Sequence, residues 1–377
     1  MSALIRISAF LFLTFSVSSV WASKARLGSL GQDPNGSFHI EDPRNIFLNP
    51  AKIADLADQV SLEAGASSIT SSPKAEGGII HNHDGYTLGV HLGRAGDIST
   101  VIDLAQSLTS AASSYFSPQN PIEIFWGQRS SSGRSIGASV LYANSKSEQS
   151  DGVDYPDSSG SILTVAGGIV ERDWEAQGKL YLLHNSKTDT SAVAKTEYEG
   201  SPSLSIGGAK RLDQNTKVSG SLYWLKFDFD NGTIEGSNDT QTINGTYHKT
   251  LKSIDGTLVF ASGGLTYSNT ATKFDGVSSE LKVNLLYLPV IVGLERPVNS
   301  WLTLRGSITQ NVLLDESTTE GASKLKTSGL DDTTVSAGLS LTFDQLSVDA
   351  TFEGFDDSTA ELNGDKLMAN VSLNYVF

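Results

Sequence analysis

The chain has 377 residues, with 27 basic and 42 acidic side chains and a formal net charge of −15. This balance excludes nucleic acid as a partner, because phosphates require a basic footprint. The absence of cysteine excludes a disulfide framework, a zinc–thiolate site and a thiol nucleophile.

Residues 1–22 have the pattern of a cleaved signal peptide. Arg6 is the only charge, it precedes an apolar run at 7–15, and the small Ala22 precedes Ser23. The run is too short for a retained membrane helix, and no later stretch approaches about 18 consecutive apolar residues. We therefore predict export and removal of residues 1–22; combined with the strand pattern of the rest of the chain, described below, export predicts location in the cell outer membrane. The mature chain would carry 26 basic and 42 acidic residues, which is a net charge of −16.

Residues 23–58 are not strand-like. Asp42 and Pro43 predict a turn, and Asn49-Pro50 predicts a short helix with proline at its first position. The tripeptide Asn49-Pro50-Ala51 follows apolar residues that include Phe47, and it lies between the signal and the first strand. In this position it resembles the amino-terminal plug of the FadL-type outer-membrane transport channels, over residues 26–65. The resemblance implies that 23–58 plug a barrel and that Phe47, Asn49, Pro50 and Ala51 gate it. The alternative is an ordinary helix-opening turn.

From residue 59 to 377 the chain consists of alternating segments with a period of two, joined by connections that are alternately short and long. The long connections are mostly acidic, and this asymmetry is typical of an outer-membrane barrel with turns in the periplasm and loops outside. Direct counting gives 16 strands; if one weak hairpin is not part of the wall, the count is 14, the FadL-type number. The segments are 60–69, 75–82, 86–93, 122–128, 136–143, 162–170, 179–185, 204–209, 218–229, 240–251, 257–267, 281–294, 302–312, 335–343, 346–355 and 367–377.

One long connection, 99–116, carries apolar residues at helical spacing, with Thr100 and Asp103 as a candidate capping box. It predicts a helix within a barrel connection. Such a helix either closes one mouth of the barrel over an apolar ligand or packs on the rim to cover its own apolar stripe.

The cleanest strands have one apolar and one small or polar face. At 335–343 the valine, alanine, leucine and phenylalanine positions oppose Ser336, Gly338, Ser340 and Thr342, and 346–352 and 223–229 alternate in the same manner. A sandwich would expose the polar faces to bulk solvent, whereas a barrel of this strand number would turn them toward a lumen. The apolar faces lack charges, as lipid requires. The predicted lumen-lining residues are Lys226, Glu295, Arg305, Asp349 and Glu353.

The last strand places Val371, Leu373, Tyr375 and the terminal Phe377 on one side. Chain ends usually fray, so a soluble strand gains little from a large aromatic residue beside its free carboxylate. The stretch resembles the closing strand of bacterial outer-membrane barrels, which implies that these four residues form the signal recognised by the barrel-assembly machinery. An edge strand of a secreted sandwich is the alternative.

No catalytic arrangement is evident, and we predict no enzyme, no cofactor and no metal site. None of the six histidines lies in a nucleophile motif. His81 and His83 share a face beside Asp84, but two ligands at a hairpin tip are far more often solvated turn residues.

The sequence thus predicts an all-β protein, a closed antiparallel transmembrane β-barrel of 14–16 strands with an amino-terminal plug and one loop helix. The expected function is passive uptake of small molecules, and FadL-like transport of hydrophobic compounds is the first hypothesis. A general diffusion porin for small polar solutes and a non-transporting surface barrel are the alternatives. The expected partners are outer-membrane lipid, the barrel-assembly machinery and a small solute; a homo-oligomer is left open.

Overall fold

The computed structural model describes residues 23–65, 74–94, 119–147, 157–189, 195–230, 232, 234–254, 256–277, 279–320, 323–353 and 370–377. The predicted signal peptide and the predicted helix at 99–116 lie outside these residues. Within them, no helix is long and apolar enough to cross a membrane.

The described chain begins with three short helical elements and continues as strands. The helical elements are α1 (Lys24–Ser29), η1 (Pro43–Ile46) and η2 (Pro50–Asp55). The strands of the first half are β1 (Gln59–Gly65), β2 (Lys74–His83), β3 (Tyr86–Leu92), β4 (Ile122–Arg129), β5 (Ser135–Ser147), β6 (Asp157–Val170), β7 (Trp174–Asp189), β8 (Thr196–Gly200) and β9 (Ser203–Arg211). Those of the second half are β10 (Thr216–Asp230), β11 (Glu235–Ile254), β12 (Thr257–Phe274), β13 (Glu280–Pro297), β14 (Leu302–Glu320), β15 (Ser323–Phe343), β16 (Leu346–Glu353) and β17 (Asn370–Val376).

The sheet closes on itself. Consecutive strands pair antiparallel around the wall, and β17 pairs with β1 from Gln59↔Val376 to Gly65↔Asn370. Strands β8 and β9 both lie between β7 and β10, interrupted at Ser201 and Pro202, so together they form one wall strand. Proline cannot donate to a ladder, which accounts for the break. The described strands therefore make a closed barrel of 16 wall strands, which confirms the direct count; the alternatives of 14 strands and of a sandwich are wrong.

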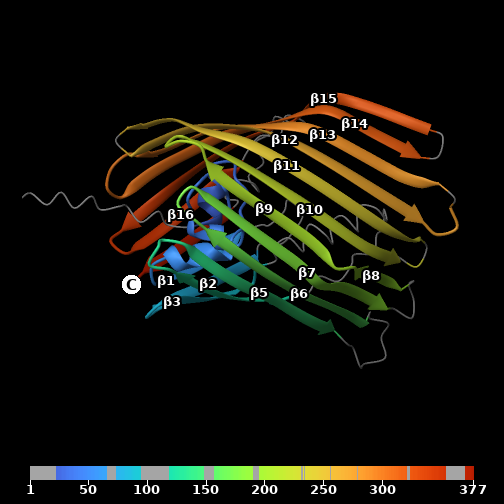
Figure 1. Cartoon of the computed structure of the whole chain (residues 1–377), viewed down its shortest axis with the longest axis horizontal. Helices are drawn as coiled ribbons and strands as arrows, with labels where there is room; N and C mark the ends of the chain where they lie inside the picture. Colours follow the sequence, from blue (N-terminus) through green and yellow to red (C-terminus); the bar gives the residue numbers. More distant parts are fainter. Residues whose placement is uncertain are drawn as a thin grey trace, which may run out of the picture.

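The two ends of the barrel differ. At one end the hairpins are tight: Gly85 has a φ of +91° and Asp344 a φ of +55° in their turns. Toward the other end, β11 to β15 extend over 18 to 21 residues each. A tilted transmembrane strand needs only about 9–11 residues, so this side of the wall continues beyond the bilayer. Figure 1 shows these long strands reaching past the rest of the barrel.

The outer face is apolar in the manner that lipid requires. Alternate residues of each strand point outward, and their large apolar side chains are exposed; on β17 these include Leu373 and Tyr375, and the terminal Phe377 follows. The opposite positions of β15 to β17 are buried and small or polar, as at Ser340, Ser347 and Ser372. The faces predicted for β15, β16 and β17 are thus confirmed, and the chain is a transmembrane β-barrel.

The predicted faces of β10 are reversed. Leu225, Phe227 and Phe229 are buried inside the barrel, and Lys226 is exposed on the outer side. The prediction of Lys226 as a lumen-lining residue is therefore wrong. Both faces of this strand carry aromatic side chains at Tyr223 and Trp224, so alternation alone does not determine which face is inside.

The amino-terminal segment, residues 23–58, lies within the barrel near its tight-turn end. Helix α1 contacts β14 to β17, whereas η2 contacts β3 to β6 on the opposite side of the wall. Figure 1 shows this segment, in blue, enclosed by the strands. A segment that touches opposite sides of a closed wall occupies its lumen.

Candidate functional site

Local sequence signals build the compact segment in the lumen. Ser23 caps α1 by accepting a hydrogen bond from the Arg26 backbone N–H at 2.8 Å. Asp42 caps η1 in the same way, and proline follows both Asp42 and Asn49 at the first helical position. Asn49 accepts from Ala51 N–H at 3.1 Å and donates to the Glu175 carboxylate at 3.1 Å. The Asn-Pro-Ala turn is therefore both self-capped and bonded to the wall.

The Asn-Pro-Ala turn packs directly against inward-facing glycines of the wall, which we call the glycine seat. Gly127 and Gly137 are register partners on β4 and β5. A β-carbon on Gly137 would stand 2.7 Å from the Ala51 backbone, and one on Gly127 would overlap Ile53. Only glycine allows the segment to approach the wall so closely. Gly89 and Gly168 complete the seat on β3 and β6.

Arg26 is the centre of a buried ion-pair cluster at the opposite wall. Its guanidinium donates to Glu295 at 2.8 and 3.0 Å and to Asp42 at 2.9 Å. Arg305 donates to the same Glu295 carboxylate at 2.6 Å and to Asp349 at 2.7 Å. Burial lowers the pKa of Arg26, but Glu295 and Asp42 outweigh burial, so the net direction is upward. The cluster joins α1 and η1 to β13, β14 and β16.

Arg44 and Lys24 form a second buried cluster with the first two strands. Arg44 pairs with Glu63 of β1 and with Glu76 of β2, the latter at 3.0 Å. Lys24 pairs with Glu76 at 2.9 Å, and its backbone N–H donates to Glu63 at 2.9 Å. Both cations and both carboxylates are almost completely buried. Removing one partner of such a group leaves an uncompensated buried charge.

A third cluster lies near the tight-turn end. Lys52 pairs with Glu175 at 3.1 Å and Glu41 at 3.5 Å, and Lys217 of β10 pairs with Glu41 at 2.7 Å. Burial raises the pKa of Glu41, but Lys52 and Lys217 outweigh it and bring the value to about 2. Through these three clusters the segment is held ionically by strands on several sides of the barrel.

The loop between α1 and η1 is held by a histidine pair instead. His39 stacks on His248 of β11 with ring centroids 4.9 Å apart and an interplanar angle of 5°. Its Nε2 lies 3.2 Å from the Ser219 hydroxyl. Burial, and then His248 and Lys217, lower the pKa of His39 to about 3. The ring is therefore neutral at pH 7.

We expect His39 to titrate near pH 3 in the folded protein. A displaced loop would bind a proton at the ordinary pKa of about 6.5. Below that value the displaced state binds more protons than the docked state, so docking weakens as the pH falls from about 6.5 to about 3. An NMR titration of labelled histidine rings measures this, with His39→Gln assigning the signal. A midpoint near 6.5 would contradict the neutral, buried ring.

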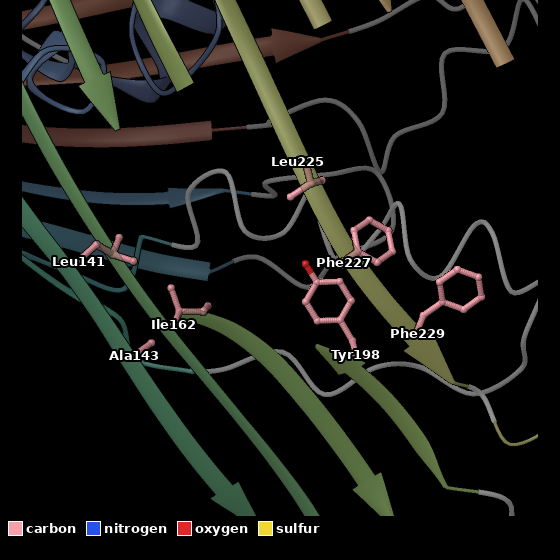
Figure 2. Packing of buried hydrophobic residues seen from close by; sticks show 7 residues of the cluster. All are labelled: Leu141, Ala143, Ile162, Tyr198, Leu225, Phe227 and Phe229. Atoms are coloured by element: carbon pink, nitrogen blue, oxygen red, sulfur yellow. The ribbon is translucent and has the colours of Figure 1, made fainter. Parts of the chain in front are cut away.

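Above the segment, the inner wall carries an apolar cluster. Leu225, Phe227 and Phe229 of β10 meet residues of β5, β6 and β8, as Figure 2 shows. The Tyr198 hydroxyl is hydrogen-bonded to His184 Nδ1, which satisfies the main polar atom of the cluster. The other members are Leu141, Ala143 and Ile162. Each of these side chains is at most 3% exposed, so the cluster can contact an apolar solute only when the groups that cover it move aside.

Within the described part of the chain, cavities border the segment, and three of them bear on the site. One of about 30 Å³ lies against β1 to β4 and includes Phe47 and His91 in its lining. One of about 380 Å³ opens near the tight-turn end between Lys52, Trp174 and Lys217. The third, of about 230 Å³, lies between Asn35, Tyr181 and Tyr223. The two larger cavities both follow β7, β9 and β10.

The structure brings several predicted site residues together. Phe47, Asn49, Pro50 and Ala51 are all buried in the lumen segment on its β3–β6 side. Glu295 and Arg305 are cross-strand partners, and Asp349 joins them through Arg305. The side chain of Glu353 lies outside the described residues. Whether these residues gate or select a solute stays a prediction.

Sequence reasoning missed the cations that hold the segment, namely Lys24, Arg26, Arg44 and Lys52, and most of their carboxylate partners. The sequence does carry a signal for these partners. Glu63, Glu76 and Glu175 are acidic residues within strands β1, β2 and β7. Acidic residues at inward positions, together with basic residues in a segment expected inside, would have indicated the pairing. Among the described residues, no group of three histidine or acidic side chains could hold a metal ion.

No family model matches the sequence, and no curated protein matches it. Solved structures do match. A bacterial polysaccharide outer membrane secretin is 11% identical over 86% of this chain and 99% of its own, with a TM-score of 0.46. A FadL homologue of Pseudomonas aeruginosa is 13% identical over 94% and 98%, with a TM-score of 0.45. The toluene transporter TbuX of Ralstonia pickettii is 10% identical over 96% and 99%, with a TM-score of 0.39.

Proposed function

We propose that this barrel is an outer-membrane channel for the passive uptake of small hydrophobic compounds. The observation that carries the proposal is the apolar cluster around Phe227, which faces inward above the lumen segment. Packing of these side chains also stabilises the wall itself, but their position on the inner side of the wall, and not toward lipid, makes this part of the lumen apolar. An apolar solute would gain about 25 cal/mol per Å² of surface that it removes from water.

The alternatives fit the lumen less well. A general porin needs an open aqueous passage, whereas residues 23–58 occupy this lumen and contact opposite walls. A non-transporting barrel needs no free volume beside its plug, whereas cavities of about 230 and 380 Å³ lie along one wall. These volumes support passage of small molecules past a plug that stays in place. We propose no enzymatic role.

Export and assembly complete the proposal. Residues 1–22 would direct the chain across the inner membrane and be removed. Val371, Leu373, Tyr375 and Phe377 would then be recognised by the barrel-assembly machinery; Leu373, Tyr375 and Phe377 are exposed on the outer face, where another protein can reach them.

We expect Phe227→Ala to lower toluene uptake by about tenfold in outer-membrane vesicles that contain the protein. The substitution removes the central ring of the cluster without adding charge. Phe343→Ala is the matched control, because Phe343 is 55% exposed on the outer face, and it should leave uptake unchanged. Sucrose uptake should stay low throughout. Rapid sucrose entry would support the porin, and entry of neither compound would support the non-transporting barrel.

A further inference from the structure

The inward residues of β7, β9 and β10 form cross-strand rows. From the tight-turn end upward, successive rows are Glu175–Ala209–Ser219, Gln177–Gly207–Ser221 and Lys179–Ser205–Tyr223. Neighbouring rows are about 7 Å apart, because a strand rises about 3.3 Å per residue and every second residue faces inward. The rows that line a cavity therefore give its position along the barrel axis.

The two larger cavities lie on either side of the middle row. The cavity of about 230 Å³ is lined by all three members of the upper row. The cavity of about 380 Å³ is lined by Glu175 and Ala209 of the lower row, and by Lys217 below it. The middle row thus separates a lumenal cavity from a vestibule at the tight-turn end.

Phe38 packs against the middle row. Its ring Cζ is 3.2 Å from the point where a β-carbon on Gly207 would stand, and the Gln177 amide is 2.9 Å from the same point. Phe38 belongs to the loop held by His39 and by Lys217, which donates to the Phe38 carbonyl at 3.4 Å. Its side chain is only partly buried, whereas the apolar side chains of the segment on its other sides, such as Leu27 and Ile53, are completely buried. Phe38 can therefore turn without emptying a core.

Among the described residues, the plug contacts the other walls more closely. The glycine seat on β3 to β6 is in direct contact with Ala51 and Ile53. Ion pairs of Arg26 fill the side toward β13 to β16, and the cavity against β1 to β4 has only about 30 Å³.

We propose that solutes pass the plug along the inner face of β7, β9 and β10, and that Phe38, closing on Gly207 and Gln177, is the gate of this route. The proposal deepens the channel function and rests on it. The plug stays docked on its other sides, and only the Phe38 side chain and its loop move. The vestibule beyond the gate is lined by charged groups such as Lys52, Glu171 and Arg211, so an apolar solute would leave the narrow part of the route directly into water.

Single cysteines test the route independently of any substrate, since the chain has none of its own. Ser205→Cys reports the lumenal cavity and Ala209→Cys the vestibule. The barrel is folded into vesicles with its tight-turn end inside, and a membrane-impermeant charged thiol reagent is added outside. We expect rapid labelling of Ser205→Cys and at least tenfold slower labelling of Ala209→Cys. Introducing Phe38→Ala into the Ala209→Cys variant should remove most of this difference in labelling rate. Introducing Gly207→Leu into that double variant should make the labelling of Ala209→Cys slow again.

Two control variants match these changes. Leu30→Ala also removes a large apolar side chain from the plug, but on the side of Phe260, and should leave Ala209→Cys slow. Gly245→Leu adds the same side chain as Gly207→Leu where a β-carbon meets nothing within 4 Å, and should have no effect. Rapid labelling of Ala209→Cys in the unaltered plug, or no acceleration by Phe38→Ala, would overturn the gate. If labelling follows the expectation while toluene uptake is absent, the gate stands and the proposed substrate class fails.

Discussion

Deletion of residues 23–57 is expected to turn a nearly silent barrel into a conducting pore, with single-channel conductance rising at least tenfold in planar bilayers. A closed wall of 16 strands encloses a lumen wide enough for an aqueous channel once nothing fills it. In the intact protein, α1 and η2 lie across that lumen between opposite walls. Large and steady conductance of the intact protein would instead establish an open porin and remove the plug from the mechanism.

The same deletion should make the pore prefer cations. It removes Lys24, Arg26, Arg44 and Lys52 and leaves their carboxylate partners on the wall, among them Glu63, Glu76, Glu175 and Glu295. Rings of wall carboxylates select cations in channels. Reversal potentials in a salt gradient measure this preference. Heat-dependent electrophoretic mobility of the deleted variant provides the control that its barrel is closed, and an unselective pore would contradict the assignment of these carboxylates to the lumen.

How much of this arrangement is visible in the sequence depends on the contrast between the two faces of each strand. On β15, β16 and β17 one face is apolar and the other small or polar, so alternation alone identifies the inside; Ser347 and Ser372 are completely buried there. On β10 the alternation from 223 to 229 is equally clear, but its apolar face lies inside, because the lumen is apolar beside Phe227, and the outer face carries Lys226. An apolar face can meet either lipid or an apolar part of the lumen, and alternation alone therefore places Lys226 on the wrong side.

The lumen contacts are less predictable than the wall because they join distant parts of the chain. Glu295 and Arg305 are ten residues apart on paired strands, so their proximity follows from the hairpin. Arg26 and Glu295 are 269 residues apart, and no local pattern relates them. The Asn49-Pro50-Ala51 turn is local and can be predicted from the sequence, whereas its glycine seat depends on the register of β4 and β5. Phe38 has no helical or strand periodicity around it, and its proposed role comes from its contact with Gly207, in the row that lies between two cavities.

Arg44→Leu is expected to raise the open probability of the intact channel by about 100-fold or more. Arg44 is buried between Glu63 and Glu76, and its loss leaves two buried carboxylates with Lys24 as the remaining cation. Breaking a buried ion pair by removing one partner costs about 3–5 kcal/mol. If that cost falls on plug docking, 3 kcal/mol corresponds to a factor of about 150 in the undocked population. Single-channel recording gives the open probability directly.

Two further variants separate the buried charge from a general loss of packing. Arg44→Leu combined with Glu63→Gln removes one positive and one negative charge, leaves Lys24 paired with Glu76, and keeps an oxygen to accept the Lys24 backbone N–H. We expect this pair to return most of the way to the original open probability, because no uncompensated charge remains in the cluster. Arg129→Leu breaks the exposed pair between Arg129 and Asp55, also a contact between wall and plug, and exposed pairs contribute only about 0–1 kcal/mol. It should change the open probability by no more than about fivefold. Equal opening in Arg44→Leu and in the double variant would mean that the guanidinium stabilises the plug by its volume, and the ionic account of docking would then fail.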